Sequence, residues 1–453
     1  MDQSRFVALD PALVCHDLVL GPGSVHALAT DSLVVSFVSQ LLVEQIGHGG
    51  SLRVTFDETH TITLRWGKAT TAGAAGRLQL EVEPSDCTAL ADLMTLVRKN
   101  QHISICATRD VEATDRYTGL EEVTLLPCAL PDLDWSDLDT STWFLGSRFR
   151  FPLLITGMTG GLARGAEINL RLAKAASAFG IPMGVGSQRV ALDNPDHASI
   201  FTVKKAVPDL FLIGNIGIAQ LLSANATDLC QRAVDMIAAD ALAIHVNVLQ
   251  EVVQVEGDRN FRGVLNKIEA IAKALSVPLL IKEVGVGLDP TTAQRLMEAG
   301  VAALDCGGKG GTSWSMIEGE RASSSVTRAV AQTFRDFGIP TAVSLAAIRA
   351  ALPHVSLAAT GGIRDGLMVA KACALGANVC GIGLPLLRAA LESEDAVHQQ
   401  LTTFAQGLRI AMVVTGARSL SDLVRRAHRS EQFFSLVDRF TTTEPVSRST
   451  PRY

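Results

Sequence analysis

The sequence predicts an α/β protein: a (β/α)8 TIM barrel preceded by a small α+β extension. Three observations lead to this prediction. From Phe151 onward, short apolar runs recur about every thirty residues, there are eight of them, and Ala- and Leu-rich segments with helical spacing lie between most of them. Strands that are apolar on both faces and alternate with helices are typical of a closed parallel sheet. An open doubly wound sheet is the alternative.

The predicted strands and helices follow each other in order along the second part of the chain. The apolar runs cover residues 152–157, 181–186, 210–217, 241–247, 278–285, 303–308, 355–362 and 379–385. Helical spacing is clearest over residues 165–179, 227–238, 264–275, 291–299 and 367–375. Small or polar residues end six of the runs, where the active-site mouth of such a barrel lies. Ordinary turns alone do not account for six such clusters, so we expect a site there.

The first 95 residues have a different pattern. We predict a helix over 34–45, paired strands over 52–56 and 61–66, and a second helix over 87–97. We interpret residues 1–95 as an α+β extension of unknown role and residues 96–453 as the barrel domain. A structural or subunit-interaction role for the extension is favoured over a second catalytic activity.

The composition excludes several classes of protein. The 453 residues carry a formal charge of −6, with 47% hydrophobic and 19% charged residues, which argues against disorder and against general nucleic-acid binding. The longest uncharged stretch, 210–227, contains polar residues and glycines, so no membrane span is expected. The N-terminus lacks a secretory pattern, which predicts a cytoplasmic protein. The eight cysteines form no CxxC pair and are expected to be reduced thiols.

Two glycine loops indicate a phosphate site. Gly361 and Gly362 follow the seventh run, and Gly381 and Gly383 follow the eighth. In barrels of this type, these two loops commonly bind phosphate through backbone N–H groups. Lys282 is an unusual charge in the fifth run. It either pairs with a buried carboxylate such as that of Glu283 or faces an electron-rich cofactor ring.

A family resemblance extends over roughly four-fifths of the chain. It is carried by RKNQHI (98–103), LPDLDWSDLDTSTWFLG (130–146), PLLITGMTGG (152–161), GVGSQR (184–189), IHVNVLQE (244–251), VEGDRNFRG (255–263), IKEVGVG (281–287), GGKGGTSW (307–314) and ATGGIRDGLMVAKACALGA (359–377). From about Leu96 onward the sequence resembles the type 2 isopentenyl diphosphate isomerases, which are FMN-dependent barrel enzymes. The HxNxxQE segment is specific to this family.

The resemblance implies an isomerase that interconverts isopentenyl and dimethylallyl diphosphate, with reduced FMN as acid/base, NADPH as its expected reductant and Mg²⁺ on the diphosphate. It implies that Gln250 assists proton transfer and that Glu251 binds Mg²⁺. It places His245 and Asn247 with Gln250 in the catalytic group. The residues implied to bind the substrate are Arg98, Lys99, His102, Ser187, Arg189 and Gln250. A prenyl diphosphate partner and a homo-oligomer are also expected.

The resemblance further implies a set of FMN-binding residues. They are Thr156, Met158, Thr159, Ser187 and Asn215 around the ring, Lys282 at its pyrimidine edge, Thr312 near the phosphate, and Gly361, Gly362, Arg364, Gly381 and Gly383 in the phosphate loops. A fixed cation at the ring edge would stabilise the anionic reduced flavin.

The sequence departs from the family pattern in two places. Asn100 and Gln101 replace two residues that are usually acidic, and the extension has no counterpart in the family.

Two competing functions remain. An FMN-dependent 2-hydroxy-acid oxidase or dehydrogenase would need a His base closely followed by Arg after a late strand. His354 is the only histidine between residues 305 and 362, and it precedes a run. A flavin-binding scaffold without activity would not need the HxNxxQE residues.

Overall fold

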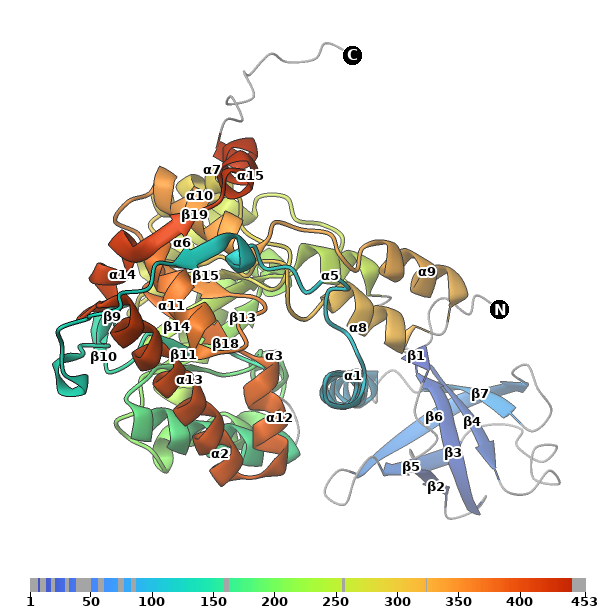
Figure 1. The fold of residues 1–453 in the computed structure, drawn as a ribbon. Helices are drawn as coiled ribbons and strands as arrows, with labels where there is room; N and C mark the ends of the chain where they lie inside the picture. The colour runs from blue at the N-terminus through green and yellow to red at the C-terminus, as the bar shows by residue number, and fades with distance from the viewer. Residues whose placement is uncertain are drawn as a thin grey trace, which may run out of the picture.

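The computed structural model describes residues 87–441, except 159–162, 255–256 and 323, together with seven strands nearer the N-terminus (Figure 1). Eight parallel strands close into a barrel in chain order. They are β11 (Leu153–Ile155), β12 (Met183–Gly184), β13 (Leu212–Gly217), β14 (Ala241–Val246), β15 (Leu279–Glu283), β16 (Ala303–Asp305), β17 (Ser356–Thr360) and β18 (Val379–Ile382). All eight predicted strands are confirmed. Pairing of β18 with β11 closes the ring, so the open sheet is wrong.

Helices surround the barrel and connect its strands. They are α2 (Ala163–Phe179), α3 (Arg189–Asp193), α4 (Ala226–Ile237), α5 (Val248–Val253), α6 (Val264–Ala274), α7 (Pro290–Glu298), α8 (Trp314–Arg321), α9 (Ser325–Thr333), α10 (Thr341–Ala351), α11 (Gly366–Ala374), α12 (Leu384–Glu392), α13 (Glu394–Thr415), α14 (Leu420–Arg426) and α15 (Glu431–Thr441). The five predicted helices correspond to α2, α4, α6, α7 and α11. Side-chain caps begin several of them, as where Asp289 accepts from the Thr292 backbone N–H before α7.

A hairpin closes one end of the barrel. Strands β9 (Thr142–Phe144) and β10 (Ser147–Phe149) pair with each other. Their Phe144 and Phe149 side chains pack with residues at the strand starts, including Ala241 and Val379. The opposite end, where the strands finish, is left for the site. A further short pair, β8 (Val123–Leu125) with β19 (Ala427–Arg429), lies outside the barrel.

The N-terminal strands form an antiparallel sheet of their own. They are β1 (Val7–Ala8), β2 (Val14–Asp17), β3 (Gly21–Leu28), β4 (Ser32–Phe37), β5 (Gly50–Thr55), β6 (Thr61–Thr71) and β7 (Arg77–Val82). The order is β1-β3-β2-β5-β6-β7-β4, and β3 also pairs with β4, so six of the strands form a closed ring. The predicted strand pair is confirmed as β5 and β6.

The predicted helix over 34–45 is wrong at residues 34–37, which belong to β4, while 38–45 lie outside the described residues. The β-branched and aromatic residues of β4 favour a strand, and β4 pairs on both edges, with β3 and β7. A short apolar run does not by itself distinguish the two structures.

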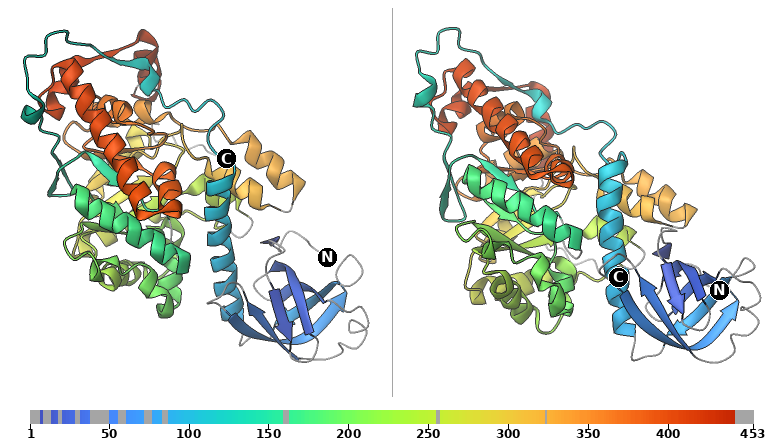
Figure 2. Two further views of the ribbon diagram at one scale, coloured as in Figure 1. Left: turned by 60° about the horizontal axis from the view of Figure 1, so that its bottom comes forward. Right: turned by 90° about the horizontal axis from the view of Figure 1, so that it is seen from below.

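Helix α1 (Cys87–Thr108) connects the two parts of the chain. Figure 2 shows it as a single rod between the N-terminal sheet and the barrel. The predicted helix over 87–97 is confirmed but continues for eleven further residues, so the predicted domain boundary at residue 95 falls inside it. Within the described part of the chain, no helix combines the length and the apolar character needed to cross a membrane.

Candidate active site

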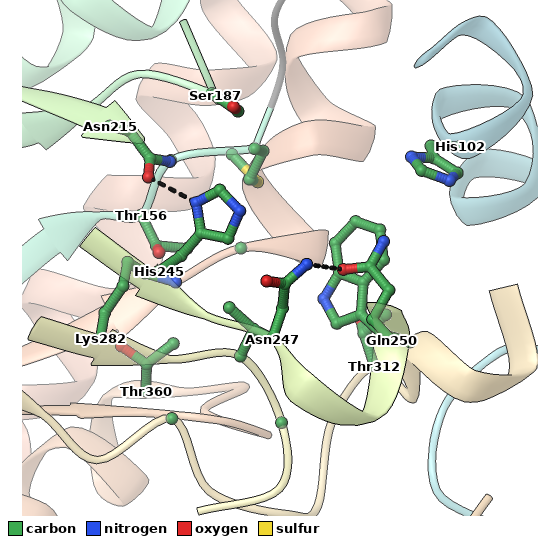
Figure 3. Close-up of a pocket in the computed structure, with 18 of the residues that line it drawn as sticks. His102, Thr156, Ser187, Asn215, His245, Asn247, Gln250, Lys282, Thr312 and Thr360 are labelled. Atoms are coloured by element: carbon green, nitrogen blue, oxygen red, sulfur yellow. Dashed lines mark hydrogen bonds between the residues drawn. The ribbon is translucent and has the colours of Figure 1, made fainter. Parts of the chain in front are cut away.

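A large cavity lies where the barrel strands end. Its volume is about 230 Å³. Every site residue predicted from the sequence lines this cavity, except Thr159, which lies outside the described residues. Figure 3 shows His245, Asn247 and Lys282 approaching one another from neighbouring strand ends, with His102 entering from α1.

Three basic residues on α1 and one on α3 form the cationic side of the cavity. Arg98, Lys99 and His102 come from α1, and Arg189 begins α3. Lys99 Nζ donates to the Ser187 carbonyl oxygen at 3.2 Å. Burial, together with the charges of Arg98 and Arg189, lowers the pKa of Lys99 to about 7. This concentration of positive charge is suited to an anion with several oxygens, such as a diphosphate.

Glu318 on α8 links this cationic side to α5, and the sequence analysis missed it. Its Oε1 lies 3.0 Å from His102 Nε2 and accepts from Gln250 Nε2 at 2.8 Å, while Oε2 is ion-paired with Arg321. Burial alone would raise the pKa of Glu318, but its contacts with His102, Arg321 and Gln250 outweigh burial and hold the pKa well below its usual range. Burial also lowers the pKa of His102, so the charge of Arg321 is the dependable part of this effect near pH 7. Gln254, also missed, bridges the same carboxylate and Arg98. With its amide turned to satisfy both neighbours, it donates to Glu318 Oε1 at 3.3 Å and accepts from Arg98 Nη1 at 3.1 Å.

A histidine in a defined tautomer lies at the end of β14. Asn215 donates through Nδ2 to the Val185 carbonyl oxygen at 3.0 Å, which leaves its Oδ1 to accept from His245 Nδ1 at 2.9 Å. His245 therefore carries its proton on Nδ1, and Nε2 is an acceptor. Burial and the nearby charges of Lys282 and Lys99 lower the pKa of His245 to about 3, so the ring is neutral near pH 7.

The start of α5 places three polar side chains together. Asn247 Nδ2 donates to Gln250 Oε1 at 3.1 Å and to Glu251 Oε1 at 3.0 Å. Asn247 Oδ1 is buried and has no hydrogen-bond partner among the described residues. Because buried polar atoms are normally satisfied, this oxygen is a candidate to accept from a bound molecule.

Lys282 does not form an ion pair with Glu283, the carboxylate that the sequence offered as an example. Glu283 Oε2 accepts instead from four successive backbone N–H groups, those of residues 284–287, at 2.6–3.0 Å. Lys282 Nζ donates to the Glu283 carbonyl oxygen at 3.3 Å and lines the cavity. It is a buried amine facing the site, and burial lowers its pKa while Asp305 and Glu283 oppose this.

The two glycine loops leave bare backbone at the opposite side of the cavity. Gly361 and Gly362 have φ of +119° and +71°, which favours glycine. A Cβ on the neighbouring Gly311 would lie 2.6 Å from the Gly362 nitrogen. Gly383 directly precedes α12, whose first turn contributes Leu384 to the cavity wall. Bare amides beside a helix N-terminus suit a phosphate.

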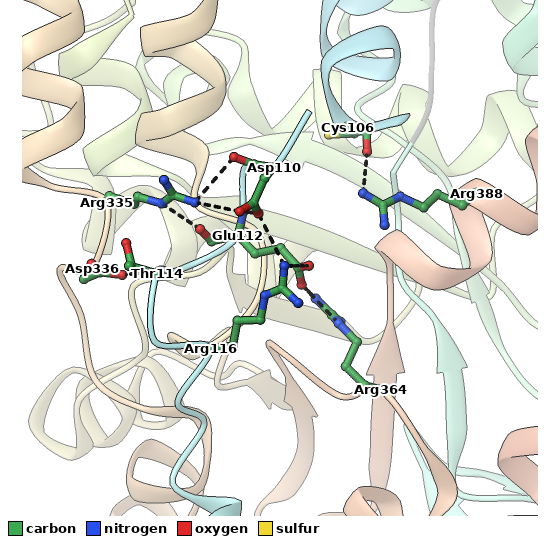
Figure 4. Close-up of polar contacts among 9 residues, drawn as sticks. All are labelled: Cys106, Asp110, Glu112, Thr114, Arg116, Arg335, Asp336, Arg364 and Arg388. Carbon is green, nitrogen blue, oxygen red and sulfur yellow. Dashed lines mark hydrogen bonds and ion pairs between the residues drawn. The ribbon is translucent and has the colours of Figure 1, made fainter. Parts of the chain in front are cut away.

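Arg364 at this end is already paired. Its Nε donates to Glu112 Oε1 at 3.1 Å, and Nη2 also contacts that oxygen (Figure 4). Glu112 lies in a segment that hydrogen-bonds to the loop before α8, where Ser313 N donates to the Val111 oxygen at 2.7 Å and Ala113 N to the Gly311 oxygen at 2.9 Å. Glu112, which was not predicted from the sequence, is therefore the carboxylate that pairs with Arg364.

The residues present fit FMN and a shared Mg²⁺. The glycine loops supply a phosphate cradle, Lys282 a cation for the ring, and Asn247 Oδ1 an unused acceptor. Glu251 is a single carboxylate, and no group of three or more His, Cys, Asp or Glu side chains suited to a metal occurs in the described part of the chain. One carboxylate matches Mg²⁺, which is commonly held jointly by the protein, phosphate oxygens and water.

Comparison with known sequences identifies close relatives. The profile of the FMN-dependent dehydrogenase family matches residues 220–430. An isopentenyl-diphosphate delta-isomerase from Nostoc sp. is 45% identical over 329 residues, which is 73% of this chain and 94% of that protein. The enzyme of the same name from Stutzerimonas stutzeri is 47% identical over 72% of this chain and 94% of its own length. One from Rickettsia akari is 42% identical over 73% of this chain and 97% of its own length.

Solved structures support the fold only. A mandelate oxidase variant is 20% identical, with a TM-score of 0.51 over 75% of this chain and 99% of that chain. Another structure of that enzyme gives 21% identity and the same TM-score over 75% and 97%. At this level of identity, fold similarity carries no information on the reaction.

Proposed function

The chain belongs to the isopentenyl-diphosphate delta-isomerase family, and from that premise we propose that it interconverts isopentenyl and dimethylallyl diphosphate. The reaction adds a proton at one carbon and removes one at another, with no net redox change. One observation carries the proposal for this chain: the cationic side of the cavity and the Gln250–Glu251 pair face the same space as the glycine loops.

The cationic side binds the diphosphate in this proposal. Arg98, Lys99 and Arg189 supply the charge, and Gln254 holds Arg98 in place. The pKa of Lys99 lies near 7 because of burial and its cationic neighbours. A bound anion favours the charged amine, so diphosphate binding should draw a proton onto Lys99. Glu251 would hold a Mg²⁺ ion, which would supply further positive charge for the diphosphate.

The cofactor proposed for the other half of the cavity is FMN, with NADPH as the source of its electrons. Bound and reduced, FMN supplies an electron-rich ring able to take up and return a proton. The loops at Gly361–Gly362 and Gly381–Gly383 hold the phosphate, with Thr312 beside them, and Lys282 presents its charge to the ring. The remaining ring-contacting residues of the proposal are Thr156, Met158, Thr159, Ser187 and Asn215.

Gln250 and His245 have distinct roles in the proposal. The Gln250 amide is fixed from both ends, donating to Glu318 and accepting from Asn247, so it can orient a proton donor or acceptor without adding charge. His245 is neutral and offers Nε2 as an acceptor to a ligand O–H or N–H. Asn247 presents its free oxygen beside them.

Oxidation of a 2-hydroxy acid is the weaker candidate. It requires a histidine base at the strand ends, whereas His354 is exposed and precedes β17, at the opposite end of that strand from the cavity. His102 and His245 are the histidines that line the cavity, and neither is closely followed by arginine in the chain.

The test combines a spectrum with two assays. The purified protein should show or acquire flavin absorption with FMN and, when reduced and given Mg²⁺, should convert isopentenyl diphosphate into dimethylallyl diphosphate. A parallel incubation with mandelate and an electron acceptor should give no product. Oxidation without isomerisation would replace the proposal with the weaker candidate, and failure to bind FMN would remove both.

A further inference from the structure

Three polar residues occupy one row across adjacent strands of the barrel. His245 on β14 is the register partner of Lys282 on β15, and Lys282 is the register partner of Asp305 on β16. Side chains of register partners project from the same face of a sheet. The row therefore continues from two cavity residues to a carboxylate that lines no part of the cavity and has no role in the proposed function.

Asp305 is fully buried and accepts from neutral groups. Its Oδ2 accepts from Thr360 Oγ1 at 2.8 Å, and its Oδ1 from the Gly307 backbone N–H at 3.2 Å. Burial raises the pKa of Asp305, and the charge of Lys282 is the largest influence that opposes it. An ionised carboxylate at this depth is costly without a compensating charge, which Lys282 supplies.

Asp305 in turn favours the charged form of Lys282. Burial lowers the pKa of Lys282, and Asp305 followed by Glu283 opposes this. The Glu283 carboxylate is already held by four backbone N–H groups, and His245 is neutral. Among the groups facing Lys282 from β14, β15 and β16, Asp305 is thus the principal source of compensating negative charge.

We propose that Asp305 is a positioning residue that keeps Lys282 charged at the cavity wall and so controls the charge presented to a bound electron-rich ring. This inference rests on the proposed binding of FMN. Asp305 acts in two opposite ways on electron uptake: its own charge disfavours it, and the charge that it maintains on the closer Lys282 favours it. Because Lys282 lines the cavity and Asp305 does not, the second effect is the larger.

The test is the midpoint potential of the FMN-loaded protein, measured against pH. Asp305→Asn should lower the potential near neutral pH, because Lys282 loses its proton, and lowering the pH should restore it. In a Lys282→Met background, the same substitution should cause no fall, since no amine is left to deprotonate. An unchanged or raised potential in the first background, or an equal fall in both, would overturn the proposal.

A second measurement tests the proposal without the Asp305→Asn variant, in case that variant does not fold. Reductive methylation of the unaltered protein with ¹³C-formaldehyde labels its lysines for NMR. The Lys282 signal is assigned as the one that is absent from the spectrum of Lys282→Met. That signal should show a charged amine through neutral pH, with or without FMN. Titration below neutral pH would refute the role of Asp305. A protein that binds no FMN would contradict the proposed function, while this signal would still test the pair.

Discussion

Glu318→Gln tests the carboxylate that joins α1, α5 and α8. Glu318 is 2% exposed, and the buried Arg321 pairs with it. A glutamine of nearly the same size removes the charge and leaves that guanidinium without its principal counter-charge. Breaking a buried ion pair costs roughly 3–5 kcal/mol. Arg321 Nε keeps its hydrogen bond to Gln101 Oε1 at 3.1 Å, so we expect a loss of about 2–4 kcal/mol in the free energy of unfolding at pH 7.

The loss should depend on pH in a defined direction. The pKa of Glu318 is held well below its usual range in the folded protein. Its contribution to stability is therefore fully present above the unfolded pKa of about 4.3 and disappears as the pH falls below that value toward the folded pKa. The difference between the unaltered protein and the variant should shrink from pH 7 to pH 3.

Urea unfolding followed by circular dichroism measures both effects. Glu320→Gln is the matched control, because Glu320 lies on the same helix and is exposed. Turnover should also fall in Glu318→Gln at pH 7, since the Gln250 amide loses its charged acceptor. A Glu318→Gln protein as stable as the control at pH 7, or a deficit of the same size at pH 3, would refute the reasoning.

Four further predictions concern the site and the extension. Gln250→Ala should lower turnover by about 10²–10⁴-fold with FMN still bound, and near-normal turnover would remove Gln250 from the reaction. Glu251→Gln should raise the Mg²⁺ concentration needed for half-maximal activity, because an amide is a poorer ligand for a hard dication; an unchanged titration would contradict this. Gly311→Ala should weaken FMN binding in a fluorescence titration, since its Cβ would meet the Gly362 nitrogen at 2.6 Å, whereas Gly165→Ala, with its nearest neighbour at 3.8 Å, should not. A chain starting near Ala91 should keep its FMN content but bind diphosphate more weakly or change its mass in solution, and insolubility or loss of FMN would make the extension part of the barrel.

The barrel was predictable because its signals are local. Each strand is a short apolar run, and each predicted helix has its own spacing, so the sequence contains both without reference to partners. The failure at residues 34–37 has the same origin, because a short apolar run favours a strand only when two neighbours pair with it. In β4 these neighbours are β3 and β7, and β7 lies some forty residues further along the chain.

Glu112 and Glu318 were not predicted from the sequence because their partners lie far away along the chain. Glu112 is separated from Arg364 by 252 positions, and Gln250 from Glu318 by 68. They matter because each is buried beside a charge of opposite sign or a fixed amide. The spacing of residues along the chain does not reveal such contacts. Residues at strand ends are found from sequence because the barrel itself brings them together. Residues that hold those side chains in place are found only when the packing is known.

Helix α1 gives the extension a physical connection to the proposed diphosphate site. The helix begins at Cys87, shortly after β7, and continues through Arg98 and His102 to Thr108. At about 1.5 Å per residue, Arg98 lies only about 16 Å along one unbroken helix from its start. The helix contacts α3, α8 and α12 on the barrel side and β6 on the other. Because a helix transmits a shift of its axis to all of its residues, a displacement of the N-terminal sheet would move the cationic side of the cavity more directly than the glycine loops, which belong to the barrel.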